Sequence, residues 1–331
     1  MKNHHKELST LIQSGLVPAD SIEEALHISQ TTPSNSAWQS FISNMLLWLG
    51  ALALAGSALF FIAFNWDDLG RFSKFGLIQL LVAASVFTYW KTSAQNPLLS
   101  KVSLLMASIF LGVLLAYFGQ TYQTGADTWQ LFLTWCILIL PWTILSRFSA
   151  QWILWLALLN LSAVLYFQTF RSTFGFILFS ENMTLWALVI INGTALIIWE
   201  FLENKWQWLA ENWAMRVVAV ASGAPLTLLV IDSIFGRQHN LISGLVWSIA
   251  MVAVYIVYRR LKPDLFMLAM ACLSGISVII SLAAKLLFDS ISDGIGTFLL
   301  LALLVILLGG ASAVWLKNTH KTLLTMTRSK L

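Results

Sequence analysis

The sequence predicts an all-α, polytopic membrane protein with about ten transmembrane helices. Of its 331 residues, 58% are hydrophobic and only 10% are charged, whereas a soluble domain carries about 25% charged residues. Apolar runs of about 20 residues, the length that crosses a hydrocarbon core of ~30 Å, recur along the chain. Most Lys and Arg residues fall in or beside the short segments that join these runs, where they act as topology determinants.

Residues 1–37 precede the first apolar run and predict a short cytoplasmic helical hairpin with a polar linker. Ser21 and Glu24 have the spacing of a capping box, which marks the start of the second helix. Acidic residues outnumber basic ones in this segment. Because phosphate binding needs a basic surface, nucleic acid is excluded as a partner.

Residues 38–331 form the predicted transmembrane domain. We expect its spans at about 41–64, 75–91, 102–119, 129–146, 151–168, 183–202, 214–235, 241–259, 264–288 and 295–316. Asn160 and Ser162 interrupt the fifth run, but no charged residue does. Pro141 and Pro225 lie inside spans, where a proline frees a backbone carbonyl or kinks the helix.

The distribution of Lys and Arg predicts that both termini are cytoplasmic. With that orientation, most of the 19 basic residues lie on the cytoplasmic side, and a few lie on the opposite side. The predicted outer residues are Arg71, Lys74, Arg171, Arg237 and Lys285. The stretch 116–135 is then exposed on the outer surface.

The stretch 116–135 is the most distinctive loop of the chain. It contains neutral hydrogen-bonding and aromatic side chains and no Lys or Arg. Gly119 and Gly125 permit tight turns within it. We therefore predict a shaped outer surface that binds a ligand or a partner. Across the outer side, the candidate ligand-binding residues are Asn65, Trp66, Gln120, Tyr122, Gln123, Asp127, Trp129, Asp232 and Lys285.

Asp232 and Lys285 are ionisable groups close to span ends. Such groups are costly in a membrane and usually face a cavity or a partner. A structural alternative stays open, because Lys285 can snorkel to the interface and Asp232 can be hydrated there. Lys285 and Asp289 are four residues apart, so they can pair on one helix face.

Other polar clusters favour plainer interpretations. The adjacent acids Asp67 and Asp68 resemble a divalent-ion site, but neighbouring acids in a loop are more often solvated, so no metal is predicted. Glu200 and Glu203, beside Lys205, are interpreted as an ordinary surface cluster.

Catalytic and cofactor-binding motifs are missing from the sequence. It contains no H-E-x-x-H, no G-x-S-x-G, no phosphate-binding glycine loop and no dinucleotide fingerprint. Its two cysteines, Cys136 and Cys272, lie in apolar runs and define neither a disulfide framework nor a metal site. We therefore expect a protein that is not an enzyme and that uses no cofactor.

Several short motifs in the first half of the chain occur together. A short N-terminal helical stub is followed by F-I-A-x-N-W at 61–66, G-Q-x-Y-Q at 119–123 and L-F-x-x-W at 131–135, with Leu140-Pro141 closing the fourth run. With this order, residues 8–150 resemble a bacterial family of predicted membrane proteins known as a domain of unknown function. The resemblance implies the bacterial cytoplasmic (inner) membrane. It implies no reaction, substrate or cofactor.

Three function classes follow from these observations. The first is a transporter-like or small-molecule-binding protein with an outward-facing polar pocket, because neutral amides and Tyr suit a weakly charged ligand. The second is a scaffold for another membrane or envelope protein, with Trp66, Tyr122 and Trp129 as anchors. The third is an intramembrane enzyme. We favour the first class. The expected surroundings are the lipid bilayer, and a membrane or envelope protein is the partner expected under the second class.

Overall fold

The computed structural model describes residues 35–64, 70–170, 182–203, 205–209, 212–236, 241–290 and 294–328. Within these ranges the chain forms helices and no strands. The hairpin predicted in residues 1–37 lies outside them, apart from its last three residues. Asn65, Trp66, Asp67 and Asp68 also lie outside the described residues.

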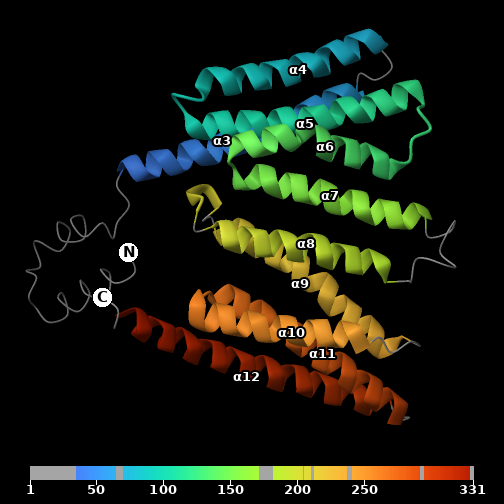
Figure 1. Ribbon diagram of the computed structural model, residues 1–331, viewed down its shortest axis with the longest axis vertical. Helices are drawn as coiled ribbons and strands as arrows, with labels where there is room; N and C mark the ends of the chain where they lie inside the picture. The colour runs from blue at the N-terminus through green and yellow to red at the C-terminus, as the bar shows by residue number, and fades with distance from the viewer. Residues whose placement is uncertain are drawn as a thin grey trace, which may run out of the picture. The chain divides into compact units, whose positions relative to one another are not determined.

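Ten described helices are long and apolar enough to cross a membrane, as the sequence predicts. Figure 1 labels each of them. Their bounds are α3 (Asn35–Phe64), α4 (Arg71–Thr92), α5 (Pro97–Tyr122), α6 (Thr128–Ser146), α7 (Ser149–Phe170), α8 (Met183–Leu202), α9 (Asn212–Phe235), α10 (Leu241–Ile256), α11 (Leu265–Ser290) and α12 (Gly294–Arg328). A 3-10 turn, η2 (Gln207–Leu209), precedes α9, and a π-helical turn, η3 (Val257–Leu261), extends α10.

The chain divides into two compact units, residues 1–114 and 115–331, with the division inside α5. In the first unit, α3 packs against α5 through Ala55, which is buried with Val102, Met106 and Phe110. Ala55 is a small residue, a type that is common where helices meet in membrane proteins.

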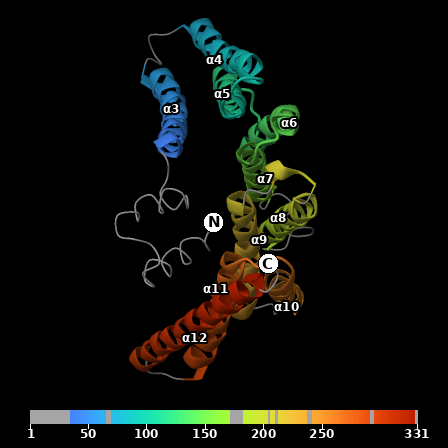
Figure 2. The same cartoon turned by 90° about the vertical axis from the view of Figure 1, so that its left-hand side faces the viewer.

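In the second unit, α8 lies beside both α7 and α9, and α11 packs against α9 and α12. The view along the helices in Figure 2 shows the same neighbours. Gly193 of α8 faces Ser222 of α9, and a Cβ added to this glycine would lie 3.7 Å from the serine Oγ. That distance is an ordinary van der Waals contact, so small residues of both helices meet at this point.

Two asparagines join α7 to α8 inside their apolar spans. The Asn160 amide donates to the Asn192 carbonyl at 2.9 Å, and the Asn192 amide donates back at 2.7 Å. Each amide also donates to a carbonyl of its own helix, Leu156 or Leu188. Because these polar groups are mutually satisfied, Asn160 does not prevent the fifth span from forming.

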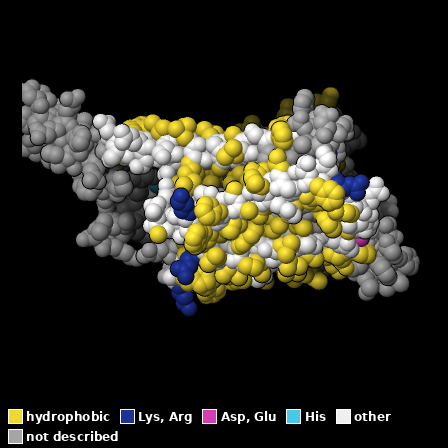
Figure 3. Space-filling view, turned by 90° about the horizontal axis from the view of Figure 1, so that it is seen from above, with side chains coloured by type: hydrophobic (Ala, Val, Ile, Leu, Met, Phe, Trp, Pro, Cys, Tyr) yellow, Lys and Arg dark blue, Asp and Glu magenta, His cyan; other side chains and the backbone are white. Residues whose placement is uncertain are grey.

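Large apolar side chains remain exposed along the described helices, as expected for a protein surrounded by lipid. Examples are Ile190 at 63% exposure and Leu299 at 68%. Figure 3 shows apolar side chains along the helix bodies and Lys and Arg toward their ends. A soluble monomer does not leave this much contiguous apolar surface in water. Pro141 and Pro225 lie inside α6 and α9, as predicted.

Candidate functional site

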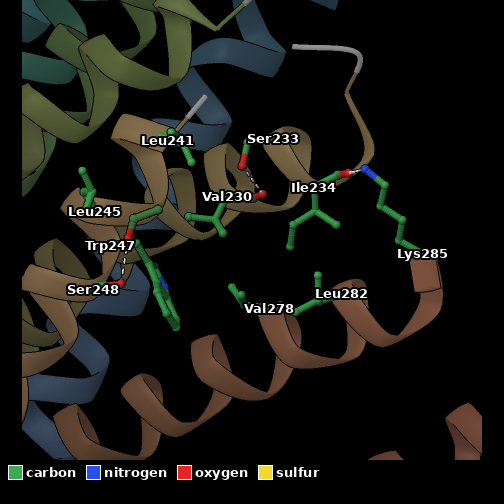
Figure 4. Close-up of a pocket in the computed structure, with 11 residues that line it drawn as sticks. Val230, Ser233, Ile234, Leu241, Leu245, Trp247, Ser248, Val278, Leu282 and Lys285 are labelled. Carbon is green, nitrogen blue, oxygen red and sulfur yellow. Dashed lines mark hydrogen bonds between the residues drawn. The ribbon is translucent and has the colours of Figure 1, made fainter. Parts of the chain in front are cut away.

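A cleft of about 500 Å³ lies between α9, α10 and α11. This volume falls in the range of small-molecule sites, roughly 300–1,000 Å³. The cleft is lined by Val230, Ser233 and Ile234 of α9, by Leu241, Gly244, Leu245, Trp247 and Ser248 of α10, and by Val278, Leu282 and Lys285 of α11. Figure 4 shows these side chains around the space between the three helices. Of the described lining residues, Lys285 alone carries a charge.

Lys285 reaches from α11 to the end of α9. Its ammonium donates a hydrogen bond to the backbone carbonyl of Ile234, one residue before α9 ends at Phe235. The last carbonyls of a helix have no partner within the helix and form the negative end of its dipole, so a cation is favourable there. The structure thus places Lys285 in the wall of a cavity.

The deeper wall of the cleft is held by a chain of hydrogen bonds. The Trp247 indole N–H donates to Ser274 Oγ at 2.9 Å, and Ser274 Oγ lies 2.6 Å from Thr227 Oγ1. The Thr227 hydroxyl proton is used on the Gly223 carbonyl, so the Ser274 hydroxyl donates to Thr227. This relay fixes the Trp247 ring between α10 and α11 (Figure 4).

The two serines of the cleft are satisfied by their own helices. Ser233 Oγ donates to the Val230 carbonyl and Ser248 Oγ to the Gly244 carbonyl, both at 2.8 Å. Their hydroxyl protons are therefore not available to a ligand. The ammonium of Lys285 is the strongest polar group that the described lining offers.

The opposite ends of the same helices, together with α8, carry an ionic network. Lys262 Nζ lies 2.5 Å from Glu200 Oε2 and 2.9 Å from Glu203 Oε2, and it also donates to the Glu200 backbone carbonyl at 3.2 Å. The Tyr258 hydroxyl, from η3, donates to the other oxygen of the Glu200 carboxylate. The interpretation of Glu200 and Glu203 as an ordinary surface cluster is therefore wrong. Their carboxylates are only about one-fifth exposed, and their partner lies some sixty residues away in the chain.

The pKa of Lys262 reflects this environment. Partial burial lowers it, but the hydrogen bonds and charges of Glu200 and Glu203 outweigh burial and hold the pKa above its ordinary value. The lysine is therefore charged at physiological pH. The network joins α8 to the segment between η3 and α11.

A second ion pair, between Arg216 and Asp264, reinforces this end. The Arg216 guanidinium lies 3.1 Å from the Asp264 carboxylate. The same carboxylate accepts the backbone N–H of Phe266 at 2.8 Å and so caps the first turn of α11. α9 is thereby tied to the beginning of α11. Together, the two ionic contacts tie the ends of α8, α9, α10 and α11 that lie opposite the cleft.

Another cavity, of about 530 Å³, lies between α7, α8 and η2. Its described lining contains no charged side chain. Five tryptophans line it, namely Trp152, Trp155, Trp199, Trp206 and Trp208. Trp208 stacks on both Trp152 and Trp206 with nearly parallel rings. The turn η2 is fixed by the Ser149 hydroxyl, which donates to the Trp208 carbonyl at 2.9 Å, and by the Trp199 indole, which donates to the Leu209 carbonyl at 3.0 Å.

The outer residues predicted from the sequence fall into three groups. Gln120, Tyr122, Gln123 and Asp127 are exposed at the turn between α5 and α6, where Gln123 has φ 44° and Gly125 φ 64°. Trp129 is half-buried, donates to Asp127 at 3.3 Å and contacts the Tyr166 ring.

The second group is the pair of ionisable residues near span ends. Lys285 lines the cleft, whereas the exposed Asp232 carboxylate accepts a hydrogen bond from Asn182 at 2.7 Å and does not line it. The third group, Asn65 and Trp66, lies outside the described residues. The Asp289 side chain, predicted to pair with Lys285, is also outside the description.

Comparison with known protein families gives a match in the N-terminal part of the chain. Residues 9–152 match the family described as "Predicted membrane protein (DUF2157)". This confirms the resemblance seen in the motifs and its extent. The DUF2157 match ends in α7, before the cleft residues of α9, α10 and α11, so the family description assigns them no role. No curated protein and no solved structure is detectably similar to the chain.

Proposed function

We propose that this integral membrane protein is transporter-like and binds a small molecule in the cleft between α9, α10 and α11. The observation that carries the proposal is a ligand-sized, largely apolar cleft with one ammonium in its wall. Sites of this kind combine apolar walls with few polar groups that orient the ligand. The proposed location is the bacterial cytoplasmic membrane, as the resemblance to DUF2157 suggests.

The two ends of the helix group support a transport role. The cleft lies toward one end of α9, α10 and α11, and the ionic contacts of Lys262 and Arg216 tie the other end. A carrier with alternating access needs one open end and one closed end at a time. The predicted positions of Lys and Arg put the cleft on the outer side.

A glycine in the cleft provides a direct test. A Cβ on Gly244 would meet no atom within 4 Å, so Gly244→Leu fills the cleft without a clash at that atom. Gly310→Leu on α12 is a matched control, because its Cβ also meets nothing and it does not line the cleft. The probes are three radiolabelled eight-carbon compounds, namely octanol, octanoate and octylamine.

We expect at least one of these probes to bind the purified chain at equilibrium. Gly244→Leu should weaken that binding at least tenfold, whereas Gly310→Leu should leave it unchanged. The proposal fails if none of the three probes binds. It also fails if Gly244→Leu binds as well as the unaltered protein.

The scaffold function remains a second candidate, because the α5–α6 turn presents exposed aromatics. Phe118 and Tyr122 are 48% and 51% exposed, and their rings contact each other at 4.8 Å between centroids. Exposed aromatic side chains beside amides are typical of protein interfaces. If this turn holds a partner, a photo-crosslinker at Gln120 should give one discrete adduct in cells, and Tyr122→Ala should abolish it. A crosslinker at Gln120 that yields no discrete adduct would count against the scaffold.

A further inference from the structure

We propose that the cleft takes an amphipathic monoanion, a carboxylate attached to a single apolar chain. This inference rests on the proposed function, because it names the ligand class of the same site. The carboxylate would lie at Lys285, and the chain would extend along α11 toward Trp247.

The charge of the ligand follows from the cation in the wall. An ammonium has three N–H donors, and the Ile234 carbonyl is the acceptor that the structure shows for Lys285 among the described residues. Among the described residues, donors of the Lys285 ammonium therefore remain for a ligand. Asp232, the acid at the same helix end, does not compete within the cleft, because its carboxylate is held by Asn182. One cation in an apolar wall matches one negative charge.

The chain of the ligand follows from the rest of the wall. Val230 and Ile234 face Val278 and Leu282 across the cleft, and none of these side chains, nor that of Leu245, can form a hydrogen bond. The two serine hydroxyls donate to carbonyls of their own helices. A second hydrogen-bond acceptor on the ligand would therefore find no donor among these side chains and would be desolvated without compensation. An unbranched apolar chain avoids that loss.

The spacing on α11 sets the approximate length of this chain. Val278, Leu282 and Lys285 follow one another at intervals of four and three residues, so they share one face of the helix. At a rise of 1.5 Å per residue, Val278 lies roughly 10 Å along the axis from Lys285. A medium-length chain, such as that of octanoate, suits this distance.

The alternative explanation of Lys285 is purely structural, with its ammonium capping the end of α9. Both explanations predict the contact with the Ile234 carbonyl. They differ in the effect of the ammonium on ligand binding. A helix cap does not contact the ligand and leaves the relative affinities for anion, alcohol and amine unchanged. A binding group raises the affinity for the anion.

The experiment measures equilibrium binding of radiolabelled octanoate to the full-length purified chain, with unlabelled octanol and octylamine as competitors. Lys285→Met keeps an apolar stem and removes the charge, and Lys285→Arg keeps the charge. Lys317→Met controls for the loss of one positive charge, because Lys317 is exposed on α12 and lies outside the cleft.

We expect octanoate to bind at least tenfold more tightly than octanol and octylamine. Lys285→Met should remove that preference, Lys285→Arg should keep most of it, and Lys317→Met should leave it unchanged. The inference is overturned if octanol or octylamine competes as well as octanoate, or if Lys285→Met keeps the preference. It is also overturned if an anionic phospholipid co-purifies and octanoate cannot displace it. If no probe binds at all, the proposed function fails as well, so the two failures are distinguishable.

Discussion

Lys262 and Lys285 lie toward opposite ends of the same group of helices, and their surroundings differ. Lys262 is met by two carboxylates and a backbone carbonyl. Within the described residues, Lys285 is met by one backbone carbonyl in a largely apolar cleft. The same type of side chain is therefore held by carboxylates at one end, whereas at the other end the described partners leave part of its hydrogen-bonding capacity unused. The partners of a lysine, rather than its residue type, therefore separate a structural charge from a candidate binding charge.

The largest effect is expected from Lys262→Met, which leaves two partly buried carboxylates without their cation. Such a loss costs ~3–5 kcal/mol in a fully buried pair and about 0–1 kcal/mol in an exposed pair. Because the Lys262 side chain is 33% exposed, we expect a loss of about 2 kcal/mol in unfolding free energy. Unfolding in detergent monitored by circular dichroism measures it, with Lys317→Met as the control. An unchanged stability would show that the network does not tie this end.

The same network predicts a dependence on alkaline pH. The pKa of Lys262 is raised in the folded protein, so its contribution is complete below the ordinary lysine value of about 10.4 and is lost as pH rises through the folded value. The unaltered protein should therefore lose more stability than Lys262→Met above this pH. Parallel stability curves for the two proteins would contradict the assignment.

A smaller effect is expected at the deeper wall of the cleft. Trp247→Phe keeps most of the ring and removes the indole donor to Ser274, so it should cost about 1 kcal/mol. Ser274→Ala removes the shared acceptor, and the double variant should cost less than the sum of the two single changes. Strict additivity would mean that the Trp247–Ser274 hydrogen bond contributes nothing.

Lys285→Met should change stability less than Lys262→Met does. It removes one hydrogen bond to a terminal helix carbonyl, which is worth about 0.3–1 kcal/mol. The comparison of the two Met variants in the same unfolding assay is the measurement. If Lys285→Met lowers the unfolding free energy as much as Lys262→Met does, both lysines have a structural role.

The smallest effect is expected at the α5–α6 turn. Gln120 is exposed, so Gln120→Ala should change the unfolding free energy by no more than about 0.5 kcal/mol. It should also leave octanoate binding unchanged, because the described cleft lies on other helices. A loss of octanoate binding in this variant would indicate that the ligand binds at the outer turn, as the sequence predicts.

The spans could be predicted because lipid imposes a simple length and composition on each helix. Even α7, with Asn160 in its apolar run, was predicted as a span, and the reciprocal pairing with Asn192 explains how it is accommodated. Lys285 could be predicted as a site candidate because a charge inside a span is costly. The partner of its ammonium could not be predicted. The structure then supplied the Ile234 carbonyl and the cleft.

Other features could not be read from local patterns. Glu200 finds Lys262 and Tyr258 in a distant segment, and no spacing rule connects them. The basic side chains after α10 were counted for topology, and that count does not show which acid they meet. Trp152, Trp206 and Trp208 stack around a cavity, and no local sequence pattern predicts that they meet.

The central claim is that the cleft opens to one side of the membrane while the ionic network closes the other. Val278→Cys places a thiol in the cleft of a chain whose Cys136 and Cys272 are replaced by alanine. A membrane-impermeant maleimide is then added to right-side-out or inside-out vesicles, with Lys205→Cys as the control for the cytoplasmic side. We predict labelling at position 278 from the outer side alone. Labelling of that thiol from the cytoplasmic side would contradict the account.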